Sequence, residues 1–241
     1  MLVRSLVLGL DLYLFPVTSS PISDLKKNYE LIAFTPIQLE NSIPFIKNIK
    51  KVLVGGSPVQ DRLKEKILKS KSNVYETYGM TETITHIAVR NLSMGEKEFT
   101  TLPGIKIGEK DNCLFIKPTH LTIEMVQTND VVEITDKNHF LLIGRRDFII
   151  NSGGVKLNPE AIEKKLSKYI SADFIVSSID HCKFGEVVAL VFKKNIPDDY
   201  NKGFTHLSKY EIPKEVLAID NFPENNGKIN RVKIRAIINN S

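Results

Sequence analysis

Short apolar runs alternate with amphipathic runs over the first hundred residues. In one amphipathic run Val59, Leu63 and Ile67 recur at the spacing that places apolar side chains on one face of a helix. The alternation predicts strands at 31–34, 51–54 and 73–78 and helices at 37–49 and 59–70. Because strands and helices alternate, we expect an α/β sheet that is parallel at least in part.

The first fifteen residues are also apolar. We expect the tail of a buried helix at 2–8, which Gly9 ends, and a strand at 10–15. Asp11 interrupts the apolar stretch and Pro16 follows it, so the segment is too short to span a bilayer and shows no signal-peptide cleavage site. A core element at the first residue indicates that the chain begins partway through a larger domain.

Short strands separated by turns replace this pattern from about Pro103, and we expect them at 105–107, 113–116, 131–134 and 140–143. No helical period lies between them, which predicts a small, mostly antiparallel β unit that resembles a barrel.

A second α/β piece follows Asp147. Asn158, Pro159 and Glu160 form a helix start, with a capping side chain, a proline at the first helical position and an acid in the first turn. This helix should run to about Ile170. The elements expected after it are strands at 174–178, 187–192 and 216–219 and a closing helix from about Arg231. The expected parts are a partial α/β subdomain at 1–102, an antiparallel β subdomain at 103–146 and an α+β domain at 147–241.

Composition removes several classes of protein. With 42% hydrophobic and 25% charged residues, the 241-residue chain is typical of a globular protein rather than a disordered one. The net charge of +5 is spread along the chain, so a nucleic-acid partner is not expected. Cys113 and Cys182 are too few for a disulfide framework or a cysteine metal site, which favours a cytoplasmic location. Neither a zinc-type histidine spacing nor the common dinucleotide and P-loop fingerprints occur.

Two turns that follow predicted strands could bind a ligand. The Gly-Gly-Ser-Pro turn at 55–58 could let the backbone approach a flat ligand, or could simply connect a strand to a helix. The segment 78–82 combines an aromatic ring, a hydroxyl and a carboxylate, which could stack on a base, meet a phosphate and hold Mg²⁺. A buried Tyr78 beside a solvated Thr-Glu pair explains the same segment equally well.

Four later positions also have two interpretations. Asp130, expected just before a strand, could accept hydrogen bonds from a ribose diol or close a turn. Arg145 could donate to the same ribose or be solvated. The segment 152–154 could admit a ligand against bare backbone or form a hairpin turn. Lys228 lies in a polar loop, where it could reach an anionic transition state or be solvated.

The order of these weak signals is specific. Together they resemble the latter half of the adenylate-forming family, which includes acyl-CoA synthetases, luciferases and nonribosomal adenylation domains. The segments that carry the resemblance are 55–58, 78–82, 128–130, 144–147, 151–163 and 223–231. Within the family, the segment 75–83 is most similar to that of the o-succinylbenzoate–CoA ligases of menaquinone biosynthesis.

The resemblance implies a role for each candidate. The part at 1–102 would be nucleotide-binding, through Gly56, Ser57, Tyr78 and Gly79. Thr81 would contact the α-phosphate and Glu82 would help to bind Mg²⁺, both as catalytic residues. The remaining implied roles are ribose binding by Asp130 and Arg145, a hinge at Asp147 for a mobile C-terminal domain, a pantetheine tunnel at Gly153 and Gly154, and a catalytic lysine for adenylation at Lys228.

The resemblance also implies a two-step reaction with ATP, CoA and a small carboxylate as partners. The carboxylate attacks the α-phosphate of ATP to give acyl-AMP, and the CoA thiol then displaces AMP. The family's Ser/Thr/Gly-rich phosphate loop has no counterpart in this sequence. We therefore expect an N-terminally incomplete enzyme that adenylates poorly without a missing N-terminal half. The alternatives are a non-catalytic AMP- or CoA-binding module and a synthetase for another aryl or fatty acid.

Overall fold

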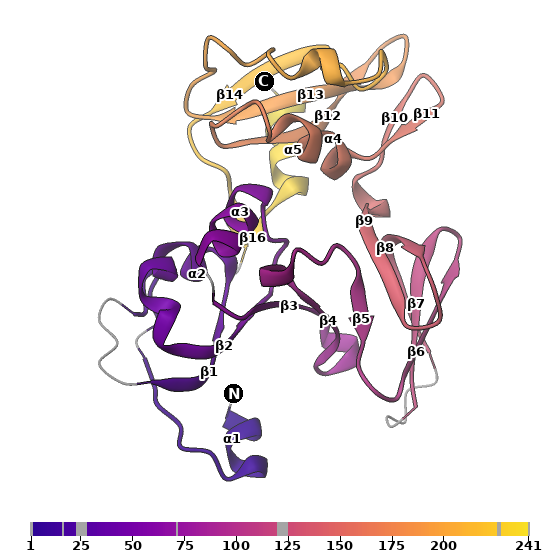
Figure 1. Cartoon of the computed structure of the whole chain (residues 1–241). Coiled ribbons are helices and arrows are strands. Elements are labelled where there is room, and N and C mark those ends of the chain that lie inside the picture. Colours follow the sequence, from indigo (N-terminus) through magenta and orange to yellow (C-terminus); the bar gives the residue numbers. More distant parts are fainter. Residues whose placement is uncertain are drawn as a thin grey trace. The chain divides into compact units, whose positions relative to one another are not determined.

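The structure is a computed structural model that describes residues 2–15, 17–22, 28–70, 72–119, 125–225 and 228–240 (Figure 1). Its contacts divide the chain into two compact units. The first unit comprises Met1–Ile107, Lys117–Val126 and Thr135–Leu141, and the second comprises Gly108–Ile116, Gln127–Ile134 and Leu142–Ser241. The domain limits expected from the sequence stay a prediction.

A parallel three-stranded core lies in the first unit. Strand β1 (Tyr29–Phe34) pairs with β2 (Ile49–Val54), and β2 pairs with β3 (Val74–Gly79), both in parallel. Two further strands extend the sheet in antiparallel fashion, β4 (His86–Asn91) beside β3 and β5 (Phe99–Thr101) beside β4. The prediction of a partly parallel α/β sheet is therefore confirmed, although the sequence pattern did not show β4 or β5.

Helix α3 (Asp61–Ser70) covers this sheet with the predicted face, because Leu63 and Ile67 are buried in one cluster with Val52, Val54 and Val59. The helix begins at Asp61 rather than at Val59, and the Val59 amide donates to the Glu76 carboxylate of β3.

The predicted helix at 37–49 is in fact two elements, α2 (Pro36–Ser42) and the 3₁₀ helix η1 (Ile43–Asn48). Pro44 causes the break, because a proline has no amide hydrogen to donate to the preceding turn. Thr35 and Gln38 form a capping box at the start of α2.

The N-terminal expectations are partly wrong. Helix α1 (Leu2–Leu8) forms and ends at Gly9, whose φ of +62° suits a helix terminus. Its apolar side chains are exposed rather than buried; Val3 and Val7 are 73% and 76% exposed. Residues 10–15 form no strand; the rings of Tyr13 and Phe15 pack against the Tyr29 ring.

Four strands contain residues of both units: β6 (Ile105–Lys110), β7 (Cys113–Pro118), β8 (Val126–Ile134) and β9 (His139–Arg145). All four were predicted, with shorter limits. In the first unit, β9 pairs with β5 through Phe140 and Phe99. The short 3₁₀ helices are η2 (Thr81–Thr83) and η3 (Leu92–Met94) in the first unit, and η4 (Arg146–Phe148) and η5 (Phe204–His206) in the second.

The second unit is a sheet with one helix on each face. Strand β13 (Gly185–Lys193) pairs antiparallel with β12 (Phe174–His181) and parallel with β14 (Glu215–Ile219), and a hairpin of β10 (Ile150–Ser152) and β11 (Val155–Leu157) joins it. Alternate residues of β12 and β13 pack on α4 (Pro159–Leu166) and on α5 (Arg231–Asn239). Asn158 caps α4 as predicted, but the helix ends at Leu166, where the next turn tightens.

A two-stranded hairpin, β15 (Glu224–Asn225) and β16 (Lys228–Ile229), precedes α5. No helix within the described ranges is long and apolar enough to cross a membrane.

Candidate functional site

The loop after β2 begins directly over the ends of two neighbouring strands. The Gly55 amide donates to the Phe34 carbonyl at the end of β1, at 3.1 Å. A Cβ atom on Gly55 would lie 2.4 Å from Oγ1 of Thr77 in β3, so only glycine fits here. Gly56 has a φ of +90° and is exposed, and Ser57 is half-buried. The structure therefore presents Gly56 and Ser57 at the carboxyl edge of the parallel strands, where α/β sheets bind ligands.

Tyr78 comes from the neighbouring strand β3 and is mostly buried. Its ring is 5.7 Å from the Phe99 ring and 5.3 Å from the Phe140 ring, between centroids, and the residue is 9% exposed. Gly79 follows in close contact with the start of β4, since a Cβ atom there would lie 2.9 Å from Cα of His86. The roles given to Tyr78 and Gly79 stay predictions.

Thr81 and Glu82 are exposed in η2. The buried Thr83 holds this turn, because its hydroxyl oxygen accepts a hydrogen bond from the Met80 amide at 3.2 Å. The next residue, Ile84, has a φ of +66°, which is a strained conformation for a β-branched side chain. A fixed turn thus displays one hydroxyl and one carboxylate to solvent.

The second unit brings Asp130, Arg145 and Asp147 together. Nη1 of Arg145 lies 3.1 Å from Oδ1 of Asp130, and Nη2 lies 2.6 Å from Oδ2 of Asp147. Partial burial favours the neutral guanidine, but the hydrogen bond to Asp147 and the charge of Asp130 outweigh it and raise the pKa of Arg145. One guanidinium therefore links the expected ribose-binding carboxylate to the expected hinge residue.

The position of Asp130 differs from expectation. It lies within β8 rather than before a strand, and it is 6% exposed. Its amide donates to the Thr128 hydroxyl, which in turn donates to the Leu114 carbonyl of β7. The turn-closing interpretation is therefore wrong, because the residue is held inside a strand.

Two neighbours of this cluster had no role in the sequence analysis. The side-chain amide nitrogen of Asn129 donates to Oδ1 of Asp147 at 2.9 Å, and Arg146 donates to the side-chain oxygen of Asn129 at 3.0 Å. Both residues lie inside segments that carried the resemblance, 128–130 and 144–147. That proximity in sequence was the only available signal for them.

Glu160 lies behind the same segment. A Cβ atom on Gly144 would lie 2.3 Å from Oε2 of Glu160 and 2.4 Å from Nδ2 of Asn158, so strand β9 touches the start of α4. Burial raises the pKa of Glu160; the charge of Arg231 opposes this rise and that of Glu163 adds to it. The segment that contains the expected hinge residue therefore starts against a partly buried acid.

The remaining candidates lie on two hairpins of the second unit. Gly153 and Gly154 form the β10–β11 turn with φ values of +57° and +85°, and the Gly153 amide donates to the Phe184 carbonyl. The hairpin-turn interpretation is thus confirmed as conformation, whereas the pantetheine role stays a prediction. Lys228 is exposed on β16.

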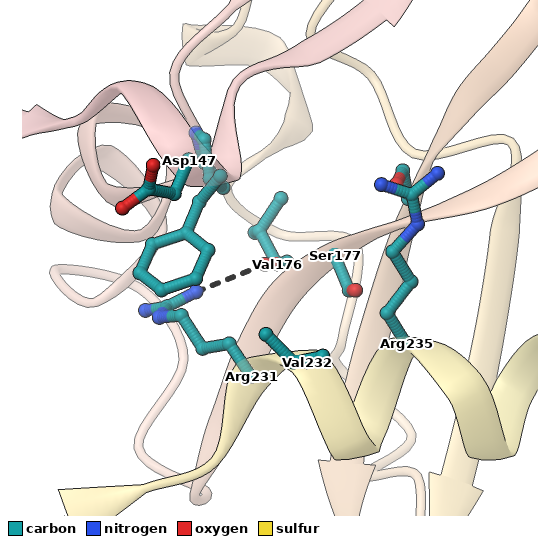
Figure 2. Close-up of a pocket in the computed structure, with 9 residues that line it drawn as sticks. Asp147, Val176, Ser177, Arg231, Val232 and Arg235 are labelled. Carbon is teal, nitrogen blue, oxygen red and sulfur yellow. Dashed lines mark hydrogen bonds between the residues drawn. The ribbon is translucent and has the colours of Figure 1, made fainter. Parts of the chain in front are cut away.

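A pocket of about 110 Å³ lies beside the expected hinge in the second unit (Figure 2). Asp147 and Phe148 are among the residues that line it, and Arg231 and Arg235 reach it from α5. Arg231 donates to the Val176 carbonyl and pairs with Glu163, and Arg235 pairs with Glu186 and Asp180. Both guanidinium groups already have carboxylate partners, so they offer no unpaired positive charge to a ligand in this pocket. The pocket is lined by residues of α5 and of the segment that contains the expected hinge residue.

Comparison with known proteins gives a consistent result, although no family model matches the chain. The 2-succinylbenzoate–CoA ligase of Staphylococcus epidermidis is 24% identical over 220 residues, which cover 78% of this chain and 46% of the ligase. The chain thus spans about half the length of the curated relatives it matches. The resemblance to the o-succinylbenzoate–CoA ligases is therefore confirmed as an overall similarity of the chain.

Solved structures agree on the fold. The o-succinylbenzoate CoA synthetase of Bacillus subtilis, in complex with the acyl-adenylate OSB-AMP, has a TM-score of 0.70 and 24% identity, covering 86% of this chain and 51% of that one. The AMP-forming acyl-CoA synthetase/AMP-acid ligase II-like protein of Dyadobacter fermentans has a TM-score of 0.51 and 31% identity, covering 92% and 69%. The chain therefore has the fold of the C-terminal part of adenylate-forming enzymes and belongs to the AMP-forming acyl-CoA synthetase family.

Proposed function

We propose that the chain is part of an ATP-dependent acyl-CoA synthetase of the o-succinylbenzoate–CoA ligase kind. A carboxylate displaces pyrophosphate from ATP to form acyl-AMP, and the CoA thiol then displaces AMP to form the thioester. The first step brings two anions together, so its rate depends on positioning and on positive charge.

One observation carries the proposal. Asp130 and Arg145, which the resemblance places at the same ribose, are fifteen residues apart in the sequence and 3.1 Å apart in the structure. A carboxylate beside a guanidinium offers acceptors and donors to two adjacent hydroxyl groups.

The first unit supplies the groups proposed for the base and the phosphates. Gly56 and Ser57 offer backbone to adenine, and Thr81 offers a hydroxyl to the α-phosphate. Glu82 offers one hard oxygen ligand, which fits Mg²⁺ because this ion is commonly held by one or two carboxylates together with substrate phosphates. When bound, Mg²⁺ supplies charge that offsets the phosphates. The relative from B. subtilis has also been solved with ATP and a magnesium ion.

Lys228 and Asp147 are proposed to serve the two steps in turn. Lys228 is exposed on a short hairpin, so it can approach a phosphate without burying its charge. Asp147 accepts from Arg145 and from Asn129. A rotation at Asp147 that withdraws Lys228 for thioester formation must break these two hydrogen bonds, which makes the hinge a switch between defined states.

Calorimetric titration tests the ribose assignment. The full chain is titrated with AMP and with 2′,3′-dideoxy-AMP, and the same is done for Asp130→Asn. We expect the dideoxy nucleotide to bind the wild type about tenfold or more weakly, since each lost hydrogen bond to a charged group costs ~1.5–3 kcal/mol. Asp130→Asn should weaken AMP by a similar factor and leave the dideoxy nucleotide unchanged.

Two results would contradict the proposal: no binding of AMP, or equal binding of AMP and its dideoxy form. Asp136→Asn is the matched control, because Asp136 is an exposed carboxylate that bonds only locally, to Asn138 and His139. AMP binding without acyl-dependent pyrophosphate exchange, in a protein that also carries a phosphate loop, would instead identify a non-catalytic nucleotide-binding module.

A further inference from the structure

Glu76 is a buried acid with no role so far. It lies on β3 two residues before Tyr78, so both side chains project from the same face of the strand, and it is 5% exposed. Its Oε2 atom accepts from Nε of Arg90 at 2.8 Å and lies 2.6 Å from Nη2 of the same side chain. This pair, in which two guanidinium nitrogens share one carboxylate oxygen, is among the most buried ion pairs of the described chain, with side-chain exposures of 6% for Glu76 and 13% for Arg90.

The other carboxylate oxygen of Glu76 faces a different segment. Oε1 accepts from the Val59 amide at 3.4 Å. Val59 directly follows the turn that contains Gly56 and Ser57, and its own side chain is 3% exposed. Glu76 therefore ties the end of this loop to β3.

Arg90 extends the connection to the aromatic cluster. Its guanidinium carbon lies 4.3 Å from the centre of the Phe99 ring, and Nη1 donates to the Lys97 carbonyl at 2.7 Å. Phe99 in turn contacts the Tyr78 ring. Through one ion pair, the loop at 55–58 and the ring of Tyr78 are fixed relative to each other.

We propose that Glu76 and Arg90 are positioning residues for the adenine pocket. The inference rests on the proposed function, because it assumes that Gly56, Ser57 and Tyr78 contact adenine. Removing the pair releases the loop end and the Phe99 ring together, so the adenine contacts lose their geometry while the ribose contacts of Asp130 and Arg145 keep theirs. The pair thus acts on one part of the nucleotide.

The experiment must separate positioning from simple stability. Glu76→Leu alone leaves a buried guanidinium unpaired and is expected to fold poorly. The double variant Glu76→Leu with Arg90→Met replaces both charges by apolar groups of similar size, which commonly restores stability. It still gives the Val59 amide no acceptor and the Phe99 ring no cation. Glu40→Gln is the matched control, because Glu40 pairs with Lys66 in the same unit at 39% side-chain exposure.

Two measurements are made on the full chain. Hydrogen exchange without ligand follows the peptide that contains the Val59 amide, and calorimetry compares AMP with ribose 5-phosphate, which lacks the base. We expect the double variant to unfold at a similar urea concentration to the wild type, to exchange faster at 55–60, and to bind AMP about fivefold or more weakly. Its affinity for ribose 5-phosphate should stay within about twofold of that of the wild type.

The outcomes distinguish the two claims. If the double variant recovers both stability and AMP affinity, or if the peptide at 55–60 exchanges as in the wild type, the positioning role is wrong. An equal loss for AMP and ribose 5-phosphate also overturns it, because the effect is then not confined to the base. If the wild type itself binds ribose 5-phosphate and AMP with the same affinity, the adenine assignment in the proposed function fails, and the inference fails with it.

Discussion

Arg231 and Arg235 lie one turn apart on α5 and offer a direct test of how burial sets the strength of an ion pair. Arg231 lies 2.6 Å from Glu163, at side-chain exposures of 18% and 20%, and also donates to the Val176 carbonyl at 3.1 Å. Arg235 pairs with Glu186 and Asp180 but is 46% exposed. Figure 2 shows both side chains projecting from the same helix, with a dashed hydrogen bond from Arg231 to Val176.

Replacing Arg231 with methionine keeps the apolar stem and removes the charge. Glu163 would keep only its bond from the Val176 amide, at 2.7 Å. A hydrogen bond to a charged group contributes ~1.5–3 kcal/mol, and an unpaired, largely buried carboxylate adds a desolvation cost. We therefore expect Arg231→Met to lower the free energy of unfolding by about 3 kcal/mol. Arg235→Met should lower it by less, about 0.5–1 kcal/mol, because water screens the exposed guanidinium and because Glu186, although only 17% exposed, keeps its bond from the Asn151 amide.

Hydrogen exchange at the amides of α5 measures both variants without assuming that the two units unfold together. Exchange through local opening should accelerate strongly for Arg231→Met and little for Arg235→Met. Urea denaturation of the same proteins gives the global value. Equal losses for the two variants, or a loss below about 1 kcal/mol for Arg231→Met, would refute the argument from burial.

Three further predictions concern the hinge and the proposed chemistry. Gly144→Ala places a methyl group 2.3 Å from the Glu160 carboxylate and should cost about 2 kcal/mol in urea denaturation, whereas an unchanged midpoint would show that Glu160 and Asn158 move aside freely. The raised pKa of Glu160 means that the folded state binds the proton of this carboxyl group more tightly than the unfolded state does. The contribution of Glu160 to stability therefore falls as the pH rises above 4.5, the ordinary pKa of a glutamate. Glu160→Gln keeps an acceptor and should remove that decline, which urea midpoints measured at several pH values would show; a parallel pH dependence would contradict it. In a protein that also carries a phosphate loop, Lys228→Ala should lower acyl-dependent pyrophosphate exchange at least about 100-fold and spare thioester formation from added acyl-AMP, with Lys233→Ala as the control.

Periodicity predicted the elements whose contacts are local. The face of α3 and the Asn158 cap of α4 are confirmed, because both depend on residues a few positions apart. The strand expected at 10–15 does not form, since an apolar run specifies burial or pairing only when a partner is present. Strand β4 was not predicted because its own sequence shows no strand pattern; it forms by pairing with the neighbouring strand β3.

For the candidate site too, the sequence predicted some features and only the structure showed the others. The resemblance supplied Asp130, Arg145 and Asp147, and the structure places them within hydrogen-bonding distance. The resemblance could not show that Asp130 lies within a strand, where the Thr128 hydroxyl beside it donates a hydrogen bond to the Leu114 carbonyl of the neighbouring strand β7. Motifs therefore indicated which residues meet, but not how each one is held.

Two largely buried ion pairs join residues that lie far apart in the sequence, so the sequence could not show them. Glu76 and Arg90 are separated by 14 positions, and Glu163 and Arg231 by 68. From the sequence alone, a single carboxylate in a strand or helix is interpreted as a solvated residue until its partner is known. Both pairs lie close to proposed functional residues, Glu76 two before Tyr78 and Arg231 three after Lys228. Because losing one member of such a pair costs more than losing both, we expect the effects of substitutions at its two positions to be strongly coupled.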